Sequence, residues 1–206
     1  CWGTTNHGAM VKNCTISGNS ARYGGGAYLA YPTIISNCIF SGNSAEYGGG
    51  SCDDGGTVTH CTFSGNRATG DGGAVRSAGF PGYGLKLRNS TLSGNSATNS
   101  GGGVWSLYSS TVSNCTISGN TALDGGGYYG NGMLTHCRLS TNTATRNGGG
   151  IIGFTLQSAV LNECTLSGNT ATSMGGGGVT CTLSNSVVEG NSAEAGGGFN
   201  ACVMYN

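Results

Sequence analysis

Charged residues and long apolar segments are scarce in this chain of 206 residues. Only 8% of its residues are Asp, Glu, Lys or Arg, and the eight basic residues balance the eight acidic ones. This neutrality gives no electrostatic basis for binding nucleic acid or an anionic membrane surface. No apolar run approaches the ~18 residues that a membrane-spanning helix needs. We therefore expect no nucleic-acid partner and no membrane span in this segment.

Glycine, in contrast, is abundant, and its 42 copies would be typical of low-complexity coil if the sequence had no period. A period is present, because the motif Asn-Cys-Thr-Ile-Ser-Gly-Asn at 114–120 recurs along the chain at intervals of 22 to 29 residues. Its copies begin at Asn13, Asn37, His60, Asn89, Asn114, His136, Glu163 and Asn185. Such a period is typical of a solenoid, in which each repeat forms one coil.

Each repeat contains three short apolar stretches separated by turns. In Cys-Thr-Ile-Ser at 115–118, alternation places Cys and Ile on one face and Thr and Ser on the other. A glycine cluster, a second apolar stretch such as 104–105 and a third such as 111–112 complete the repeat. We predict an all-β fold, a right-handed single-stranded parallel β-helix of about eight coils with three strands per ~24 residues. Residues 1–206 form one domain, a fragment or polymerising unit of a larger extracellular protein.

One asparagine follows the first strand of every repeat. These residues are Asn19, Asn43, Asn66, Asn95, Asn120, Asn142, Asn169 and Asn191. Stacked coils place each amide beneath the next, which predicts a hydrogen-bonded structural ladder. Asparagine also tolerates left-handed backbone angles at a turn. An alanine two residues later in each repeat indicates an inward position with little room.

Six of the ten cysteines occupy one inward position of the repeat: Cys14, Cys38, Cys61, Cys115, Cys137 and Cys164. Stacked parallel neighbours have Cβ atoms ~4.8 Å apart, beyond the ~3.5–4.5 Å that a disulfide prefers. We therefore predict a column of buried thiols. Cys181 and Cys202 lie outside this column on adjacent coils, which makes them the candidate disulfide.

The outward positions of the first strand form an array of hydroxyl groups. Its members are Thr15, Ser17, Thr62, Ser64, Thr91, Ser93, Thr116, Ser118, Thr165 and Ser167. The array is similar to the flat threonine-rich faces of ice-binding solenoids and is a candidate ice- or glycan-binding face. An ordinary solvated polar face is the simpler interpretation. Asn13, Asn89 and Asn114 each open an Asn-x-Thr glycosylation sequon.

Aromatic residues gather around the glycine clusters and the strand after them. They include Tyr23, Tyr28, Tyr31, Tyr47, Phe80, Tyr83, Trp105, Tyr108, Tyr128 and Tyr129. We interpret them as core and subunit-interface residues, with stacking on sugar rings as the alternative. The two longest repeats gain their extra residues after the glycine clusters at 72–73 and 148–150. Insertions at one connection lie on one side of a solenoid, often the binding side.

No arrangement of residues indicates catalysis, a metal or a cofactor. Cys-x-x-Cys does not occur, and His60 and His136 lie on separated coils. Asp53 and Asp54 are adjacent, but neighbouring repeats offer no acids at the matching place. The acids that precede glycine clusters (Glu46, Asp71, Asp124 and Glu194) are explained as turn residues. We therefore expect no enzyme, and a polysaccharide lyase or hydrolase remains the alternative.

Phe-Ser-Gly-Asn at 40–43 and 63–66 matches the pattern Phe-x-x-Asn, and 72–75 reads Gly-Gly-Ala-Val. These motifs resemble the repeats of the polymorphic outer-membrane protein family, autotransporter-type proteins within the pectate-lyase-like β-helix superfamily. The resemblance covers nearly the whole chain. It implies a right-handed parallel β-helix that is displayed at the cell surface and acts in adhesion.

The sequence thus predicts a secreted or cell-surface β-helix with a structural or adhesive role. Neither end of the repeat array carries a polar cap, so we expect copies of the chain to stack end to end into a fibre or stalk. Carbohydrate or a host cell surface is the other expected partner. Ice or glycan binding through the Thr/Ser array and polysaccharide cleavage are the alternative functions.

Overall fold

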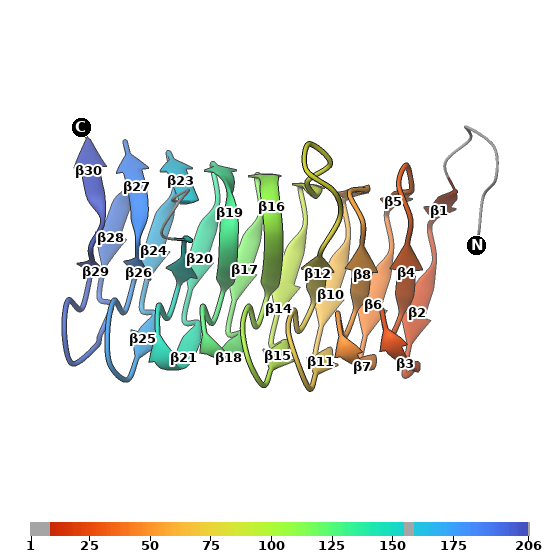
Figure 1. The fold of residues 1–206 in the computed structure, drawn as a ribbon, viewed down its shortest axis with the longest axis horizontal. Coiled ribbons are helices and arrows are strands. Elements are labelled where there is room, and N and C mark those ends of the chain that lie inside the picture. Colours follow the sequence, from red (N-terminus) through yellow and green to blue (C-terminus); the bar gives the residue numbers. More distant parts are fainter. Residues whose placement is uncertain (1–8, 155–158, 206) are drawn as a thin grey trace.

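The computed structural model describes residues 9–154 and 159–205. Throughout this part of the chain the regular structure is β-strand, and every strand pair is parallel. The coils stack along one axis, from β1–β4 at the N-terminal end to β28–β30 at the C-terminal end (Figure 1). Strands at ~4.8 Å spacing give a rod roughly 40 Å long. The described residues include no helix long and apolar enough to cross a membrane.

Three parallel sheets form the sides of the prism. The first, here called the Thr/Ser sheet, contains the Thr-Ile-Ser segment of each repeat. Its strands are β2 (Thr15–Ser17), β6 (Ile39–Ser41), β10 (Thr62–Ser64), β14 (Thr91–Ser93), β17 (Thr116–Ser118), β20 (Arg138–Ser140), β24 (Thr165–Ser167) and β28 (Val187–Glu189). They pair in this order without a register shift.

The second, short sheet follows the ladder asparagines. Its strands are β3 (Ser20–Tyr23), β7 (Ser44–Tyr47), β11 (Arg67–Ala68), β15 (Ser96–Ala97), β18 (Thr121–Asp124), β21 (Thr143–Asn147) and β25 (Thr170–Ala171). The repeated alanine of these strands faces inward, and Ala68, Ala97 and Ala122 form a small buried cluster of their own.

The large sheet contains two strands from most coils. The post-glycine strands are β4 (Ala27–Leu29), β8 (Ser51–Asp53), β12 (Val75–Ser77), β22 (Ile151–Ile152), β26 (Gly178–Val179) and β29 (Phe199–Asn200). The strands that lead to the next repeat are β1 (Met10–Lys12), β5 (Ile34–Ser36), β9 (Thr57–Thr59), β13 (Lys86–Arg88), β23 (Ala159–Asn162), β27 (Cys181–Ser184) and β30 (Val203–Tyr205). Two coils join both parts into one long strand, β16 (Val104–Ser113) and β19 (Tyr128–Thr135). The second and third strands predicted for each repeat therefore lie in one sheet, and the short sheet adds a strand that the sequence did not predict.

The interior is one continuous apolar core filled by alternate side chains of all three sides. Phe40 and Phe63 stack on each other inside the Thr/Ser sheet, with ring centroids 4.6 Å apart and planes 7° from parallel. Ile117, Leu139 and Leu166 continue this column and are fully buried. The period-2 pattern of each strand therefore decides which residues face the core.

The ladder asparagines form one continuous chain of hydrogen bonds from Asn19 to Asn191. At each step the side-chain Nδ2 donates to the Oδ1 of the next coil at 2.9–3.1 Å. Asn120 Nδ2 also donates to the Leu92 carbonyl of the preceding coil at 3.0 Å, and its Oδ1 accepts the Asn95 backbone N–H at 2.9 Å. Each buried amide therefore uses its donors and its acceptor to join three coils.

Left-handed backbone does not fall on the ladder asparagines, where the sequence placed it. It falls on the residue just before, as at Gly119 (φ 62°), and on the residue that opens each repeat, as at Asn114 (φ 52°). The glycine clusters are required for a different reason, which is the close packing of neighbouring coils. A Cβ on Gly126 would lie 2.5 Å from the Thr143 carbonyl oxygen, and one on Gly127 would lie 3.0 Å from Asn142 Nδ2. These glycines let neighbouring coils approach the ladder closely.

Both insertions lie at one corner, between the post-glycine strand and the strand that follows it. One is the loop between β12 and β13, which carries the exposed Phe80 and Tyr83. The other lies between β22 and β23, and its residues 155–158 are outside the described part of the chain. The extra length therefore gathers beside one face of the large sheet.

We expect Asn120→Ala to destabilise the protein by about 3 kcal/mol or more, because it leaves the buried Asn95 N–H and Leu92 carbonyl without partners. Urea denaturation followed by circular dichroism measures the change. Asn99→Ala, at an exposed position of the preceding coil, is the matched control and should change stability by less than about 0.5 kcal/mol. Equal effects of the two substitutions would contradict a structural role for the ladder.

Candidate functional site

One row of side chains projects outward from the post-glycine strands of eight successive coils. The strand register aligns Tyr28, Cys52, Arg76, Trp105, Tyr129, Ile152, Val179 and Asn200, here called the outer column. In-register parallel strands place such neighbours ~4.8 Å apart. The column therefore presents aromatic, cationic and apolar groups along the rod, on the side where both insertions lie.

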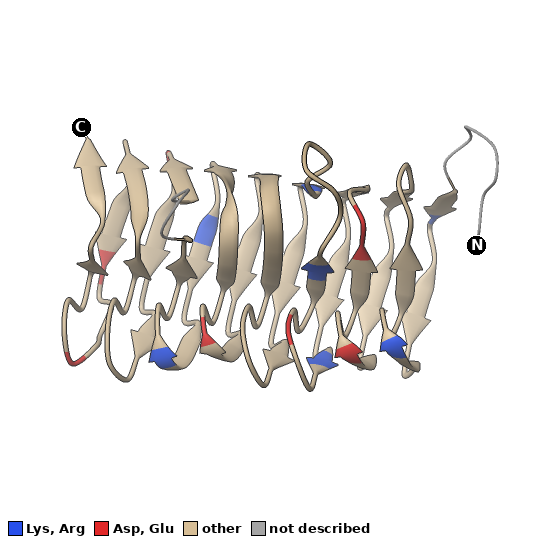
Figure 2. Cartoon of the chain, in the orientation of Figure 1, with Lys and Arg blue, Asp and Glu red and all other residues tan. Residues whose placement is uncertain are grey.

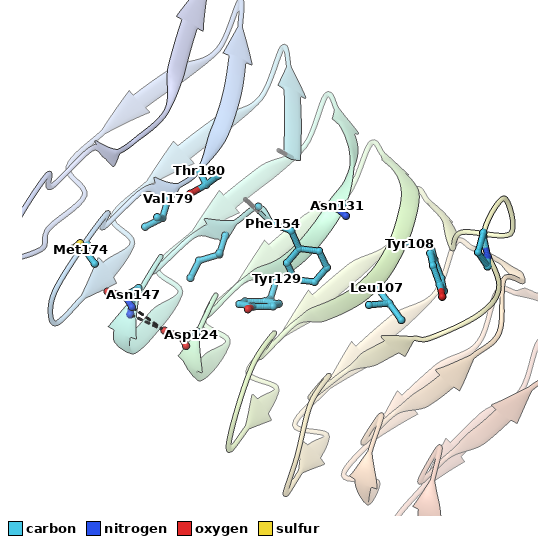
Figure 3. Close-up of a pocket in the computed structure, with 13 residues that line it drawn as sticks. Leu107, Tyr108, Asp124, Tyr129, Asn131, Asn147, Phe154, Met174, Val179 and Thr180 are labelled. Atoms are coloured by element: carbon cyan, nitrogen blue, oxygen red, sulfur yellow. Dashed lines mark hydrogen bonds between the residues drawn. The ribbon is translucent and has the colours of Figure 1, made fainter. Parts of the chain in front are cut away.

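A groove of about 850 Å³ follows the C-terminal half of the outer column (Figure 3). Tyr129 and Phe154 lie at its centre, with ring centroids 5.3 Å apart and planes at 71°. Leu107 and Tyr108 lie toward one end, and Met174, Val179 and Thr180 toward the other. Pro81, Asp124, Asn131, Asn147, Ile152 and Gly153 complete the lining. The groove thus crosses several coils, in the size range of small-ligand sites.

A bulge in β16 builds the wall at the Tyr108 end. Ser106 pairs with Gly130 and Ser110 pairs with Gly132, so three residues of β16 oppose Asn131 alone. The Ser106 and Ser110 hydroxyls bond to each other across the base of the bulge at 2.5 Å, and Ser106 Oγ donates to the Tyr108 carbonyl at 2.8 Å. The bulge is therefore pinned from inside and holds Leu107 and Tyr108 out beside the groove.

Two amide oxygens at the groove have no hydrogen-bond partner. They are Asn131 Oδ1 and Asn147 Oδ1, both buried from solvent. Asn131 sits between Gly130 and Gly132, whose φ angles of 140° and 153° let the strand bend around it. Buried acceptors without partners are costly and rare in folded proteins. A ligand that carries hydroxyl groups would satisfy both.

Asp124 is the one carboxylate among the described groove residues, and it is already engaged. Its Oδ1 accepts Arg146 Nε at 3.0 Å and the Asn147 backbone N–H at 3.2 Å, and Arg146 Nη2 bonds to its Oδ2. Asp71 and Glu46 likewise bond to neighbouring coils, through the Ser100 N–H at 3.2 Å and Arg22 Nε at 3.0 Å. These three acids therefore join coils, and the explanation by local turn chemistry is wrong for them.

The aromatic residues are on the outside of the prism far more than expected. Of the ten that the sequence grouped together, Tyr128 alone is in the core, where its hydroxyl donates to the Asn131 carbonyl at 2.7 Å. Its neighbour Tyr129 faces outward because successive residues of a strand point to opposite sides. The core part of the interpretation therefore holds for Tyr128, and the interface part stays a prediction. This clustering was the sequence signal for the groove, whereas Asn131 and Asn147 had none beyond the Gly-Asn-Gly segment at 130–132.

The predicted thiol column is buried except at its first member. Cys38, Cys61, Cys115, Cys137 and Cys164 are at most 2% exposed, whereas Cys14 is exposed because it belongs to the first described coil. Each thiol donates to the carbonyl two residues earlier, as Cys115 does to Ser113 at 3.2 Å. Hydrogen bonding to Cys115 and burial raise the pKa of Cys137 to about 12. Ser90 fills a gap in the column, and its hydroxyl accepts the Cys61 N–H at 3.1 Å.

Cys181 and Cys202 are thiols in the structure. The register of β27 with β30 places them directly over one another, in the same geometry as the thiol column. The Cys181 N–H donates to Cys202 Sγ at 3.1 Å, an arrangement that suits a thiol pair. The position of this pair outside the thiol column is therefore no reason to expect a disulfide here and thiols in the column. Peptide mapping without reduction would show whether the disulfide forms in solution.

The Thr/Ser array lies on a different side of the prism from the groove. Its threonines share one outward column with Ile39, Arg138 and Val187, which interrupt it. Its serines share the other with Ser41, Ser140 and Glu189. The sequons at Asn13, Asn89 and Asn114 open at the adjacent corner with exposed side chains. The array is thus polar, with a shallow hollow beside Arg138.

Metal-ligating groups do not converge. No group of three or more His, Cys, Asp or Glu side chains able to hold a metal ion occurs among residues 9–154 and 159–205. His136 Nε2 and Glu163 Oε2 pair at 2.8 Å on adjacent coils, as an exposed ion pair when the histidine is protonated. These two residues also carry the left-handed backbone of their repeats, with φ of 52° at each.

Asp53 is the most unusual acid in the chain. Although it lies on a strand end beside Asp54, it points into the prism and is fully buried. Its Oδ1 accepts the Gly55 N–H at 2.7 Å and the Gly56 N–H, while its Oδ2 has no partner. Burial raises the pKa of Asp53 from 3.8 to about 6 against the opposing effect of these two amide bonds. A role in a lyase-type acid cluster is not supported by this inward position.

Stacked parallel coils, an asparagine ladder and a lateral groove define this molecule as a β-solenoid with a groove along one side. The family described as "Right handed beta helix region" matches residues 1–206, and the chain belongs to that family. No curated protein and no solved structure showed significant similarity to the chain. The right-handed β-helix predicted from the repeats is confirmed, while the finer resemblance to polymorphic outer-membrane repeats is not.

We expect Asp53→Asn to abolish one component of the pH dependence of stability. The folded protein holds the Asp53 proton more tightly than the unfolded chain does, so this residue favours folding most below pH 4 and progressively less as the pH rises to 6. Relative to wild type, the variant should gain about 3 kcal/mol between these pH values.

Urea denaturation at several pH values measures this gain, and the exposed Glu194→Gln is the control. A constant difference between Asp53→Asn and wild type from pH 4 to 7 would contradict the assignment.

Proposed function

We propose that this protein is an extracellular adhesive β-helix that binds carbohydrate in its lateral groove. The observation that carries the proposal is the pairing of aromatic faces with two unsatisfied amide oxygens in one groove. Surface display is supported by the resemblance of its repeats to those of surface-displayed β-helices. Adhesion then means recognition of a glycan by a rigid rod.

The groove matches both the apolar ring faces and the hydroxyl groups of a carbohydrate. Tyr129 and Phe154 offer two rings at a steep angle, and Tyr108 adds a third, so the apolar face of a sugar ring has stacking partners. Sugar hydroxyls are donors that match the Oδ1 atoms of Asn131 and Asn147. The side chains rest on strands and a pinned bulge, which keeps the site preorganised before binding.

Binding without cleavage is the role that the acids of the groove support. Glycoside hydrolysis uses a pair of carboxyl groups on either side of the scissile bond. Among the described residues of the groove Asp124 is the single carboxylate, and Arg146 and Asn147 hold it. We therefore favour an adhesive protein over a polysaccharide lyase or hydrolase.

We expect Tyr129→Ala to weaken binding of a neutral oligosaccharide by about tenfold or more, because it removes the central stacking face. Asn131→Ala should weaken binding as well, yet cost little stability, since its Oδ1 has no partner to lose. A glycan array identifies the tightest neutral ligand, and isothermal titration calorimetry then gives the dissociation constants, with thermal melting as the check on folding.

The control is the double variant Thr91→Ala with Thr116→Ala on the Thr/Ser sheet. It should bind the oligosaccharide as wild type does. Loss of binding in this variant but not in Tyr129→Ala would assign the ligand to the Thr/Ser array and refute the groove. Absence of binding to every glycan on the array would refute the proposed function itself.

End-to-end stacking is a second proposal, and the direction of the asparagine ladder favours it. Asn191 donates its Nδ2 to the preceding coil, while the inward Met204 of β30 is 58% exposed. A further coil, from a continuing chain or a second copy, would cover this apolar surface and extend the ladder. Such head-to-tail contacts generate open filaments. Electron microscopy at high protein concentration should show rods of several lengths, and uniform rods of one unit length would contradict stacking.

A further inference from the structure

Arg76 occupies the outer column next to the carbohydrate groove, and two aromatic rings hold its guanidinium. Its Cζ lies 4.9 Å from the centroid of Tyr47 and 4.8 Å from that of Trp105. Nη1 points toward Cys52 on the neighbouring coil, with its nitrogen 3.8 Å from Sγ. Rings on two sides fix the plane of the guanidinium and leave its edges to make hydrogen bonds.

The cation has no anionic partner in the described structure. The ion pairs found among residues 9–154 and 159–205 involve Arg22, His136 and Arg146. Arg76 Nε is buried and has no hydrogen-bond partner. A buried N–H group that lacks an acceptor is costly, since it loses water without replacement. The chain thus holds a positive charge in place with its Nε–H donor unused.

The acids nearest to Arg76 are occupied by other donors. Asp54 Oδ2 accepts the Tyr28 hydroxyl at 2.6 Å, and this hydrogen bond raises the pKa of Tyr28 to about 12. Asp71 Oδ1 accepts the Ser100 N–H at 3.2 Å. In Figure 2 the basic segment on β12 and the acidic one at β8 stand on neighbouring coils of an otherwise sparsely charged rod. These carboxylates moderate the positive field and leave the Arg76 Nε–H without an acceptor.

A hollow of about 370 Å³ opens beside this guanidinium. It is lined by Ala21, Arg22, Tyr23, Tyr28, Cys52, Asp54 and Arg76. Arg22, at its far side, pairs with Glu46 at 3.0 Å and is largely exposed. The hollow is large enough for a charged substituent, and the outer column connects it through Trp105 to Tyr129 of the groove.

We propose that Arg76 and this hollow form an oxyanion subsite, which binds a carboxylate or sulfate group carried by the bound ligand. A guanidinium edge matches two oxygens of either group with parallel hydrogen bonds. The inference extends the proposed function, because it specifies a ligand with negative charge located to the N-terminal side of the groove. Carboxylate and sulfate share the required geometry, and the experiment separates them.

The direct test observes the Arg76 Nε–H resonance in protein labelled with ¹⁵N-arginine. We expect sodium sulfate or glucuronate to shift this signal with saturation, and sodium chloride or glucose at matched concentration to leave it in place. The larger of the two shifts identifies the preferred oxyanion. Arg76→Gln assigns the signal, and Arg67→Gln, an exposed arginine of the short sheet, should retain the response. An Arg76 signal that ignores both oxyanions would overturn the proposal.

Affinity measurements separate this subsite from the groove. Arg76→Gln should weaken binding of an acidic oligosaccharide by about tenfold or more and leave that of its neutral counterpart unchanged. Arg76→Lys should recover only part of the loss, because an ammonium group lacks the planar fork. Equal affinity of wild type and both variants for the acidic ligand would refute the subsite. If wild type and both variants failed to bind the neutral oligosaccharide while the Arg76 signal still responded to an oxyanion, only the proposal of a carbohydrate groove would be refuted.

Discussion

The hydrogen-bonded column of asparagines fixes the distance and the alignment between coils. Each amide in it accepts two hydrogen bonds and donates two, so a coil that slipped by one residue would leave several buried polar groups without partners. The neighbouring glycines leave no room for a side chain, because an added Cβ would lie 3.0–3.3 Å from these amides. At the next corner, the cysteine and serine side chains likewise donate a hydrogen bond to the carbonyl two residues earlier. Register is thus set by polar groups, while the apolar core supplies the bulk of the burial.

Much of this framework follows from the sequence, because residues at the same position of each repeat adopt the same local structure. The ladder asparagines, the inward cysteines and the outward threonines each recur at fixed places in the period. Strand alternation then decides their direction. The corner that absorbs both insertions is also visible as variation in repeat length. Left-handed backbone was harder to place, since Gly-Asn within the motif offers two candidates and the structure uses the glycine, together with the residue that opens the repeat.

The binding face could not be derived in the same way, because its residues break the repeat. Leu107 and Tyr108 line the groove through a bulge that opposes three residues to one, and the bulge depends on a bond between Ser106 and Ser110 that no pattern indicates. Asn131 looks like any polar residue of a turn, yet it lies buried between two glycines in an extended strand. Asp53 reads as one half of an exposed acidic pair and is inward and buried. The hydrogen bonds that fix these features join residues two to four apart and recur at no position of the repeat.

The contrast between residues that follow the repeat and residues that break it indicates which side of the rod can carry a functional site. The Thr/Ser sheet beside the ladder keeps one register along the stack, and the short sheet shifts by one residue between β18 and β21. The corner beside the post-glycine strands has no ladder residue, so it accepts a bulge in one coil and loops in others at little cost to the stack. The same side carries the unsatisfied acceptors of Asn131 and Asn147 and the unpaired guanidinium of Arg76. Ser51 Oγ and Asp53 Oδ2, inside the prism, also lack partners, but three of the five unsatisfied buried atoms of the described residues lie on this outer side, and this supports the proposed recognition there.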